Sequence, residues 1–357
     1  MATKITDSEF RCKIPFEALY IHAIPWENEK GYAFLSGPCF CYARANKILE
    51  KRYNEVANDP LDFLISDKRL EFLTRIIQHD YTNCGTCPVY RAKEHNGNWT
   101  AEDFGYFWPN DVGQKIKKSW NEGNLKTIMP YRLSLGLDET CNLHCLTCRL
   151  NPKVNNFEIT DGDLQQISYI VSKVNELTVG GDGEVFSSRN YKKFFSNDIM
   201  HGSLKSIDFF TNGTLFNEKN WNIIHPANQK AIIRIRISLD AACEDTYKLI
   251  RGDHWSTLMK NIEFIKELKK DFNFELFTNF TISKYNLDNV ESFADFALNL
   301  GFDQVQYSFA RPLFHPEVGK SDNKFIIPVD ERGDIIELLK LIREKYDDYK
   351  IVLYEAG

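Results

Sequence analysis

From about residue 131 onward, the sequence alternates between short apolar runs and helical segments. Candidate strands cover 132–137, 175–180, 206–211, 232–239, 274–282 and 302–309, and candidate helices cover 161–174, 256–270, 286–300 and 330–348. Strands that alternate with helices predict βαβ units with a parallel sheet, and right-handed crossovers wind such units into a barrel. Six strands are evident and the apolar end at 349–357 adds a weaker seventh. We therefore expect an α/β fold with a partial (β/α)6 barrel of the TIM type.

The part of the chain before the barrel has a different pattern. The segments EALYIHAI and GYAFLSGPCFCYA predict two strands joined by the polar turn PWENEKG, and DKRLEFLTRIIQH predicts a helix. A length of 357 residues is enough for about two or three domains. We predict a small β-hairpin and helix module over 1–100, a linker over 101–128 and the partial barrel over 129–357.

Charge and hydropathy limit the classes of partner. The net charge is −6, so the chain offers no overall basic surface to nucleic acid or to an anionic membrane. The first residues lack the charged start and apolar run of a secretory signal. No apolar run reaches the roughly 18–20 residues that span a bilayer. These features predict a cytoplasmic protein without a membrane partner and disfavour nucleic acid as a substrate.

Cysteine is concentrated in the first part of the chain, where eight of the nine cysteines precede residue 150. In a reducing compartment, clustered cysteines indicate metal ligands rather than disulfides. Cys141, Cys145 and Cys148 lie within eight residues, directly after the first predicted barrel strand. Thiolates hold iron–sulfur clusters, and a cubane cluster with three protein ligands leaves one iron open for another molecule. A zinc knuckle or an unligated cysteine group is the alternative interpretation.

The spacing Cys-x-x-x-Cys-x-x-Cys after a first strand resembles the radical S-adenosylmethionine superfamily. Three later segments resemble further motifs of that family in the same order: GGDGEVF at 180–186, TNGTLF at 211–216 and ISLDAACEDTYKLIRG at 237–252. Each follows the carboxyl end of a predicted parallel strand, where barrel enzymes place their chemistry. The chain departs from the family at Val185, where proline is usual, and at Thr147, where an aromatic residue is frequent.

The resemblance implies a [4Fe-4S] cluster held by Cys141, Cys145 and Cys148, with S-adenosylmethionine on the open iron. It also implies these cofactor-binding residues: Gly181, Gly183, Glu184, Asn212, Ser238, Asp240, Arg251 and Ile282. Arg251 would pair with the cofactor carboxylate, and Asp240 would contact the ribose or cap a helix. Ile282 and Tyr307 would line the adenine or, equally, pack within the barrel.

The cysteines before residue 90 resemble a SPASM or twitch module, which carries an auxiliary iron–sulfur cluster. The resemblance implies Cys12, Cys39, Cys84 and Cys87 as its ligands, with Cys41 as the alternative to Cys39. A zinc site built from the same cysteines is the alternative to the cluster. The module usually follows the barrel, whereas here it precedes it. Cys243, beyond the fourth strand, is expected to be a buried apolar residue rather than a hydrogen-atom donor.

By resemblance, the chain is expected to be an enzyme of radical chemistry, of an oxidoreductase or transferase type. It would cleave S-adenosylmethionine reductively to a 5′-deoxyadenosyl radical and remove a hydrogen atom from a substrate, with an external one-electron reductant of the flavodoxin or ferredoxin type. A peptide or protein is the expected substrate. Radical oxidation or epimerisation of a sugar or another small metabolite is the alternative, and a non-catalytic zinc or iron–sulfur scaffold is a third interpretation.

Overall fold

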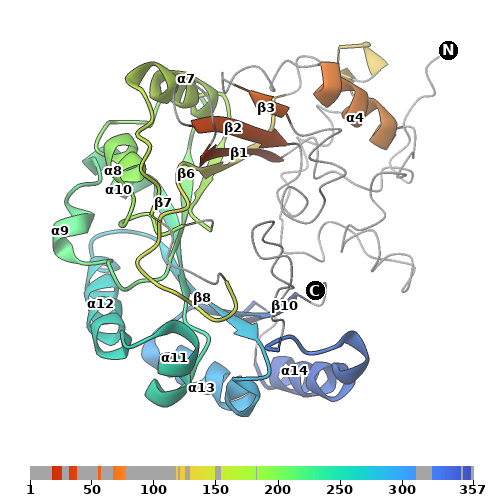
Figure 1. The fold of residues 1–357 in the computed structure, drawn as a ribbon, viewed down its shortest axis with the longest axis vertical. Coiled ribbons are helices and arrows are strands. Elements are labelled where there is room, and N and C mark those ends of the chain that lie inside the picture. Colours follow the sequence, from red (N-terminus) through yellow and green to blue (C-terminus); the bar gives the residue numbers. More distant parts are fainter. Residues whose placement is uncertain are drawn as a thin grey trace. The chain divides into compact units, whose positions relative to one another are not determined.

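The computed structural model of the chain describes residues 18–25, 32–37, 55–57, 67–77, 118–119, 121–124, 129–148, 154–181, 183–310, 324–346 and 349–354. Figure 1 shows the helices and strands of these residues, coloured along the chain. The chain divides into two compact units. The first takes in residues 1–138, 156–179 and 199–206, and the second takes in 139–155, 180–198 and 207–357.

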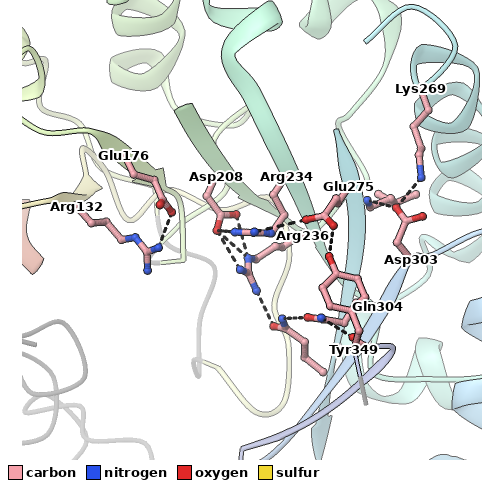
Figure 2. Close-up of polar contacts among 12 residues, drawn as sticks. Arg132, Glu176, Asp208, Arg234, Arg236, Lys269, Glu275, Asp303, Gln304 and Tyr349 are labelled. Atoms are coloured by element: carbon pink, nitrogen blue, oxygen red, sulfur yellow. Dashed lines mark hydrogen bonds and ion pairs between the residues drawn. The ribbon is translucent and has the colours of Figure 1, made fainter. Parts of the chain in front are cut away.

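The first unit contains a sheet with the strand order β5-β4-β1-β2-β3. Its strands are β1 (Ala18–Pro25), β2 (Tyr32–Gly37), β3 (Glu55–Ala57), β4 (Arg132–Gly136) and β5 (Glu176–Val179). The helices α4 (Asp67–Ile77) and α7 (Asp161–Val171) belong to the same unit. The predicted hairpin is confirmed as the antiparallel pair β1 and β2. Arg132 in β4 and Glu176 in β5 form an ion pair of 2.7 Å across the parallel pair (Figure 2).

The amino-terminal hairpin extends the sheet of β4. Strand β1 pairs in parallel with β4, so that Ile21 lies opposite Leu135. This pairing was not predicted, because the sequence pattern indicates that a segment is a strand but not which distant strand it joins. Strands β1 and β4 thus share one sheet, although they lie on opposite sides of the predicted boundary at residue 129. The assignment of residues 1–100 to a cluster module stays a prediction.

The second unit contains parallel strands in the order β10-β9-β8-β7-β6. They are β6 (Ser206–Thr211), β7 (Ile232–Ser238), β8 (Glu275–Ile282), β9 (Gln304–Phe309) and β10 (Ile351–Tyr354). Its helices are α8 (Arg189–Phe195), α9 (Glu218–Trp221), α10 (Pro226–Ala231), α11 (Glu244–Arg251), α12 (Trp255–Leu268), α13 (Val290–Leu300) and α14 (Gly333–Lys345), with 3₁₀ turns at η4 (Leu287–Asn289) and η5 (Val329–Glu331). The α/β partial-barrel prediction is confirmed, including the seventh strand, β10. Among the described helices, none combines the length and the apolarity that a membrane crossing needs.

The two faces of strands β6–β10 carry different side chains. On one face, the centre of the Phe280 ring lies 4.5 Å from that of Phe293 in α13, and the Tyr307 hydroxyl donates to the Val290 carbonyl at 3.0 Å. Successive side chains along a strand point to opposite faces, so the neighbours of Phe280 in β8 and of Tyr307 in β9 point to the other face of the sheet. We call that face the polar face, and its polar residues include Asp208, Arg234, Arg236, Ser238, Asn279, Gln304 and Gln306.

On the polar face, one buried carboxylate holds two arginines of the neighbouring strand. Asp208 in β6 accepts hydrogen bonds from Arg234 Nη1 at 3.0 Å and from Arg236 Nε at 2.9 Å (Figure 2). Arg236 Nη1 also donates to Gln306 Oε1 in β9 at 2.7 Å. Burial opposes ionisation of Asp208, but the two guanidinium groups outweigh it and hold its pKa below the usual value. These ion pairs therefore hold β6 against β7 in addition to the backbone hydrogen bonds between the two strands.

Asp208→Asn is expected to lower the free energy of unfolding by about 3–5 kcal/mol at neutral pH, since two guanidinium groups lose their shared counter-ion. The folded pKa of Asp208 lies below its unfolded value of about 3.9, so the advantage of the wild type is fully present above about pH 4. It is lost as the pH falls through the folded pKa. Urea unfolding followed by circular dichroism, from neutral to strongly acidic pH, measures this difference.

The matched control is Asp253→Asn, because Asp253 is exposed in the same unit. It should change the free energy of unfolding by less than about 0.5 kcal/mol. A gap between wild type and Asp208→Asn that stays constant across the pH range would contradict the interpretation of Asp208 as an ionised partner.

Candidate active site

The three-cysteine loop, residues 139–148, follows strand β4 and is anchored to helix α11. Leu146 donates its backbone N–H to the carbonyl of Ile250 at 2.9 Å, and the N–H of Cys148 donates to the Cys145 carbonyl at 3.1 Å. The three thiols differ in environment: Cys141 is half-buried, Cys145 is buried and Cys148 is exposed. The loop thus presents its sulfurs from a position that the end of α11 holds.

Side-chain and backbone N–H groups point at two of the three sulfurs. Arg251 Nη1 lies 3.7 Å from Cys145 Sγ, and Asn212 Nδ2 lies 3.8 Å from Cys141 Sγ. The backbone N–H of Leu143 is 3.5 Å from the same Cys141 sulfur. Burial raises the pKa of Cys145 to about 11, and the charge of Arg251 opposes that shift. The buried thiol would therefore stay protonated unless a metal centre displaced its proton.

Glu184, in the glycine-rich segment, joins that segment to the turn after β6. Its carboxylate accepts from the Thr211 hydroxyl at 2.8 Å, from the Asn212 backbone N–H at 2.6 Å and from the Phe186 N–H at 3.3 Å. Burial raises the pKa of Glu184, and these donors oppose the shift. Gly180, four residues earlier, has a φ of +89°, and a Cβ there would lie 2.4 Å from the carbonyl oxygen of Phe210. The segment therefore needs glycine at position 180 for its close approach to β6. The Glu184 carboxylate holds the segment to the turn after β6 by hydrogen bonds, and we call this set of contacts the Glu184 staple.

A chain of amide hydrogen bonds connects the Thr-Asn-Gly turn to the cysteine loop. Asn212 Nδ2 donates to Asn142 Oδ1 at 3.0 Å, and Asn142 Nδ2 donates to Thr214 Oγ1 at 2.9 Å. The Thr214 hydroxyl donates in turn to Asn212 Oδ1 at 2.7 Å. Gly213 has a φ of +76°, and a Cβ added there would lie 2.6 Å from a methyl carbon of Leu258. These contacts set the amide of Asn212 beside Cys141.

Asp240 and Arg251 form a buried ion pair beneath the loop. Asp240 Oδ2 accepts from Arg251 Nε at 2.9 Å and from Nη2 at 2.5 Å. Asp240 has a φ of +60°, and its other carboxylate oxygen accepts from the Thr281 backbone N–H at 2.6 Å. The Asn286 side chain donates to the Asp240 carbonyl at 2.9 Å. Burial opposes the charge of Arg251, but Asp240 outweighs it and raises the pKa of the guanidinium further.

Most of the residues expected at the site are connected in the structure. Direct contacts link Cys141 with Asn212, Cys145 with Arg251, and Glu184 with Asn212. Gly181 has a φ of +91°, as a glycine-rich turn requires, and Gly183 lies beside Glu184 in the same segment. Ser238 ends β7 on the polar face, in register with Asn279.

Ile282 is fully buried and lines a small cavity with Tyr307 and with Ile336 and Leu339 of α14, on the helix-facing side of the sheet. This position suits packing within the barrel, one of the two alternatives considered for it, and its contact with the adenine stays a prediction. One expectation does not agree with the structure. Cys243 was expected to be buried but is exposed at the start of α11, with its sulfur 3.4 Å from the Thr246 hydroxyl oxygen.

Several residues that organise the site were not singled out from the sequence. Asn142 and Thr214 complete the amide chain, and Asn286 holds the backbone of Asp240. Asn142 stands directly after Cys141, so its position in the motif was the available signal. Nothing in the sequence pattern indicated Asn286, because it lies 46 residues from Asp240 and meets it only in the folded chain. The expected auxiliary ligands Cys12, Cys39, Cys41, Cys84 and Cys87 lie outside the described residues.

The three-cysteine loop fits an iron–sulfur cluster. Thiolates are the usual ligands of such clusters, and N–H donors around the sulfurs stabilise the thiolate charge. Within the described part of the chain, no three Cys, His or carboxylate side chains form a group that would hold one metal ion. A single zinc ion needs all its ligands at one point, whereas a cubane cluster takes one thiolate per iron and therefore wider-spaced sulfurs. The N–H donors at Cys141 and Cys145 therefore suit thiolates that hold a cluster.

The staple role of Glu184 predicts a specific cost for Glu184→Gln. The amide keeps the shape, but in either orientation its NH₂ group opposes the backbone N–H of Phe186 or of Asn212. We expect the free energy of unfolding to fall by about 1–3 kcal/mol, measured as a lower urea midpoint. The matched control is Glu263→Gln, on an exposed residue of α12. Equal midpoints for the two variants would contradict the staple.

Comparison with known proteins gives similarity to curated relatives called "Probable GTP 3′,8-cyclase". The protein of Saccharolobus solfataricus is 23% identical over 224 residues, which cover 62% of this chain and 70% of that protein. The protein of Sulfurisphaera tokodaii is 24% identical over 223 residues, which cover 61% of this chain and 66% of that protein. The chain thus spans about two thirds of the length of these relatives. No family model matches the chain.

Among solved structures, Streptococcus suis SuiB bound to S-adenosylmethionine has the same fold. The TM-score is 0.51 at 14% sequence identity, over 94% of this chain and 72% of SuiB. The three-cysteine loop, the order of the strand-end segments and these similarities support assignment of the chain to the radical S-adenosylmethionine superfamily of enzymes, whose cofactors are a [4Fe-4S] cluster and S-adenosylmethionine.

Proposed function

We propose that this enzyme abstracts a hydrogen atom from a substrate after reductive cleavage of S-adenosylmethionine, in the modification of a peptide or protein. The observation that carries the proposal is the joining of three separate segments at the cysteine sulfurs, through Asn212 at Cys141 and Arg251 at Cys145. The bound cluster and cofactor would supply one-electron cleavage to a 5′-deoxyadenosyl radical. The electron would come from a flavodoxin- or ferredoxin-type reductant.

The residues of the site would have three roles: some would hold the cluster, some would bind the cofactor, and some hold other site residues in place. Cys141, Cys145 and Cys148 would each bind one iron and leave the fourth open. Ser238 and Arg251 would bind the cofactor at the end of β7, and the backbone of Gly181 and Gly183 would approach it closely. Asn212 would contact it from the turn after β6. Glu184 and Asp240 act from within the protein, because their carboxylates are engaged by protein donors.

The polar face offers a place for the substrate. The interior of an ordinary closed barrel is filled by bulky branched side chains. Here β7 carries Arg236 two residues before Ser238, and Asp208 of β6 lies opposite Arg234, four residues before Ser238. Gln306 of β9 lies level with Ser238, because both pair with Asn279. Such a face suits a substrate with hydrogen-bonding groups. The exclusion of water and of other hydrogen donors from it would keep the radical on its target.

Two substrate classes remain in the proposal. SuiB has been solved with its precursor peptide SuiA, and the curated relatives carry the name of an enzyme that acts on GTP. Both statements describe those proteins. We favour a peptide because the amino-terminal cysteines resemble a SPASM or twitch module, with Cys12, Cys39, Cys84 and Cys87 around an auxiliary cluster. A small metabolite such as a nucleotide or a sugar is the alternative. A deuterated peptide or deuterated GTP that passes deuterium into 5′-deoxyadenosine would identify the class.

Cleavage of the cofactor tests the proposal directly. The anaerobically reconstituted chain, given dithionite and S-adenosylmethionine, should form 5′-deoxyadenosine, measured by liquid chromatography. Cys145→Ala should lower the product at least about a hundredfold, since its iron loses a ligand. The matched control is Cys243→Ala, because that thiol is exposed, lies 3.4 Å from the Thr246 hydroxyl oxygen and stands at the opposite end of α11 from Arg251. Cleavage by Cys145→Ala at the level of Cys243→Ala would overturn the assignment of the three thiols.

A further inference from the structure

The contact of Arg251 with the sulfur of Cys145 points to a role beyond cofactor binding. Arg251 Nη1 lies 3.7 Å from Cys145 Sγ, and both residues are buried. We propose that Arg251 raises the reduction potential of the cluster by donating a hydrogen bond to the Cys145 sulfur, and that Asp240 is the positioning residue that sets this bond. The inference rests on the proposed function, because it requires the cluster that the three cysteines would hold.

The geometry of the guanidinium fixes which nitrogen faces the sulfur. Asp240 Oδ2 accepts hydrogen bonds from Arg251 Nε at 2.9 Å and from Arg251 Nη2 at 2.5 Å, so the carboxylate holds one edge of the planar guanidinium group. Two hydrogen bonds on one edge fix the plane and the rotation of an arginine side chain. The remaining nitrogen, Nη1, is directed at Cys145. The sulfur contact therefore follows from the ion pair.

Asp240 is itself held from two other directions. Its Oδ1 accepts from the Thr281 N–H at 2.6 Å, and its carbonyl accepts from Asn286 Nδ2 at 2.9 Å. Its backbone adopts a φ of +60°, which a residue other than glycine rarely takes. The carboxylate thus has little freedom to follow Arg251 if the arginine moves. This rigidity distinguishes a positioning residue from an adaptable counter-ion.

The effect on the cluster follows from charge. Reduction adds one negative charge to a cluster, and hydrogen bonds to the sulfurs are among the factors that set its potential. A charged N–H donor stabilises the reduced form more than the oxidised form, and a buried site strengthens the interaction. Asn212 makes a similar contact at Cys141, at 3.8 Å, but its amide is neutral. Arg251 is therefore expected to have the larger effect of the two.

An anaerobic redox titration of the reconstituted full chain tests the inference, with electron paramagnetic resonance as the readout and no S-adenosylmethionine present. At the midpoint potential of the wild type, Arg251→Gln should lower the ratio of reduced to oxidised cluster about tenfold, equal to about 59 mV for one electron. The matched control is Lys248→Gln, because Lys248 is exposed on the same helix and loses the same charge. Its midpoint should remain that of the wild type.

A second variant guards against misfolding. Arg251→Gln leaves the Asp240 carboxylate buried without its partner, whereas the double variant Asp240→Asn/Arg251→Gln removes both charges and keeps the net charge. The double variant should also lower the ratio, because the bond to the sulfur is lost. Wild-type midpoints in both variants, together with 5′-deoxyadenosine formation by the wild type, would overturn the inference alone. A wild-type chain without a cluster signal would overturn the proposed function itself.

Discussion

The ion pair between Asp240 and Arg251 connects the parts on which the site depends. Arg251 ends helix α11, Asp240 follows strand β7, and the residue before Arg251 accepts the hydrogen bond that anchors the cysteine loop. The left-handed backbone of Asp240 costs about 1–3 kcal/mol. Hydrogen bonds to a charged group contribute about 1.5–3 kcal/mol each, and the Asp240 carboxylate accepts them from Arg251 and from Thr281. The bonds therefore outweigh the strain, and the strained position persists.

The acidic residues of the site act mainly as structural ligands of the protein itself. Glu184 and Asp240 are buried, and backbone N–H groups and neighbouring side chains take up their carboxylates. Their removal would disturb the turns that carry Asn212 and Arg251. Asp208 has the same kind of role deeper on the polar face, where it holds Arg234 and Arg236. The recurring device is a buried carboxylate that fixes the direction of a nitrogen-bearing side chain.

The sequence pattern predicted the elements better than their contacts. Strands β4 to β9 agree with the expected segments within about two residues, because their apolar runs are short and separated by helices or turns. The helices α8 to α11 were not predicted, since four to eight residues are too few for a periodic signal. The pairing of β1 with β4 was also missed, because strands more than a hundred residues apart carry no local sign of their register.

The sequence by itself determined the spacing of the three cysteines, the order of the segments after β5, β6 and β7, and the alternation that produces a parallel sheet. These features are local, since each depends on residues within one turn or one strand. The tertiary structure alone decided which carboxylate accepts hydrogen bonds from which donor. It paired Asp240 with Arg251, joined Glu184 to Asn212 and set Arg251 against Cys145, across separations of 11, 28 and 106 residues. Contacts of that kind form only when the chain returns to the same edge of the sheet, and no local pattern specifies them.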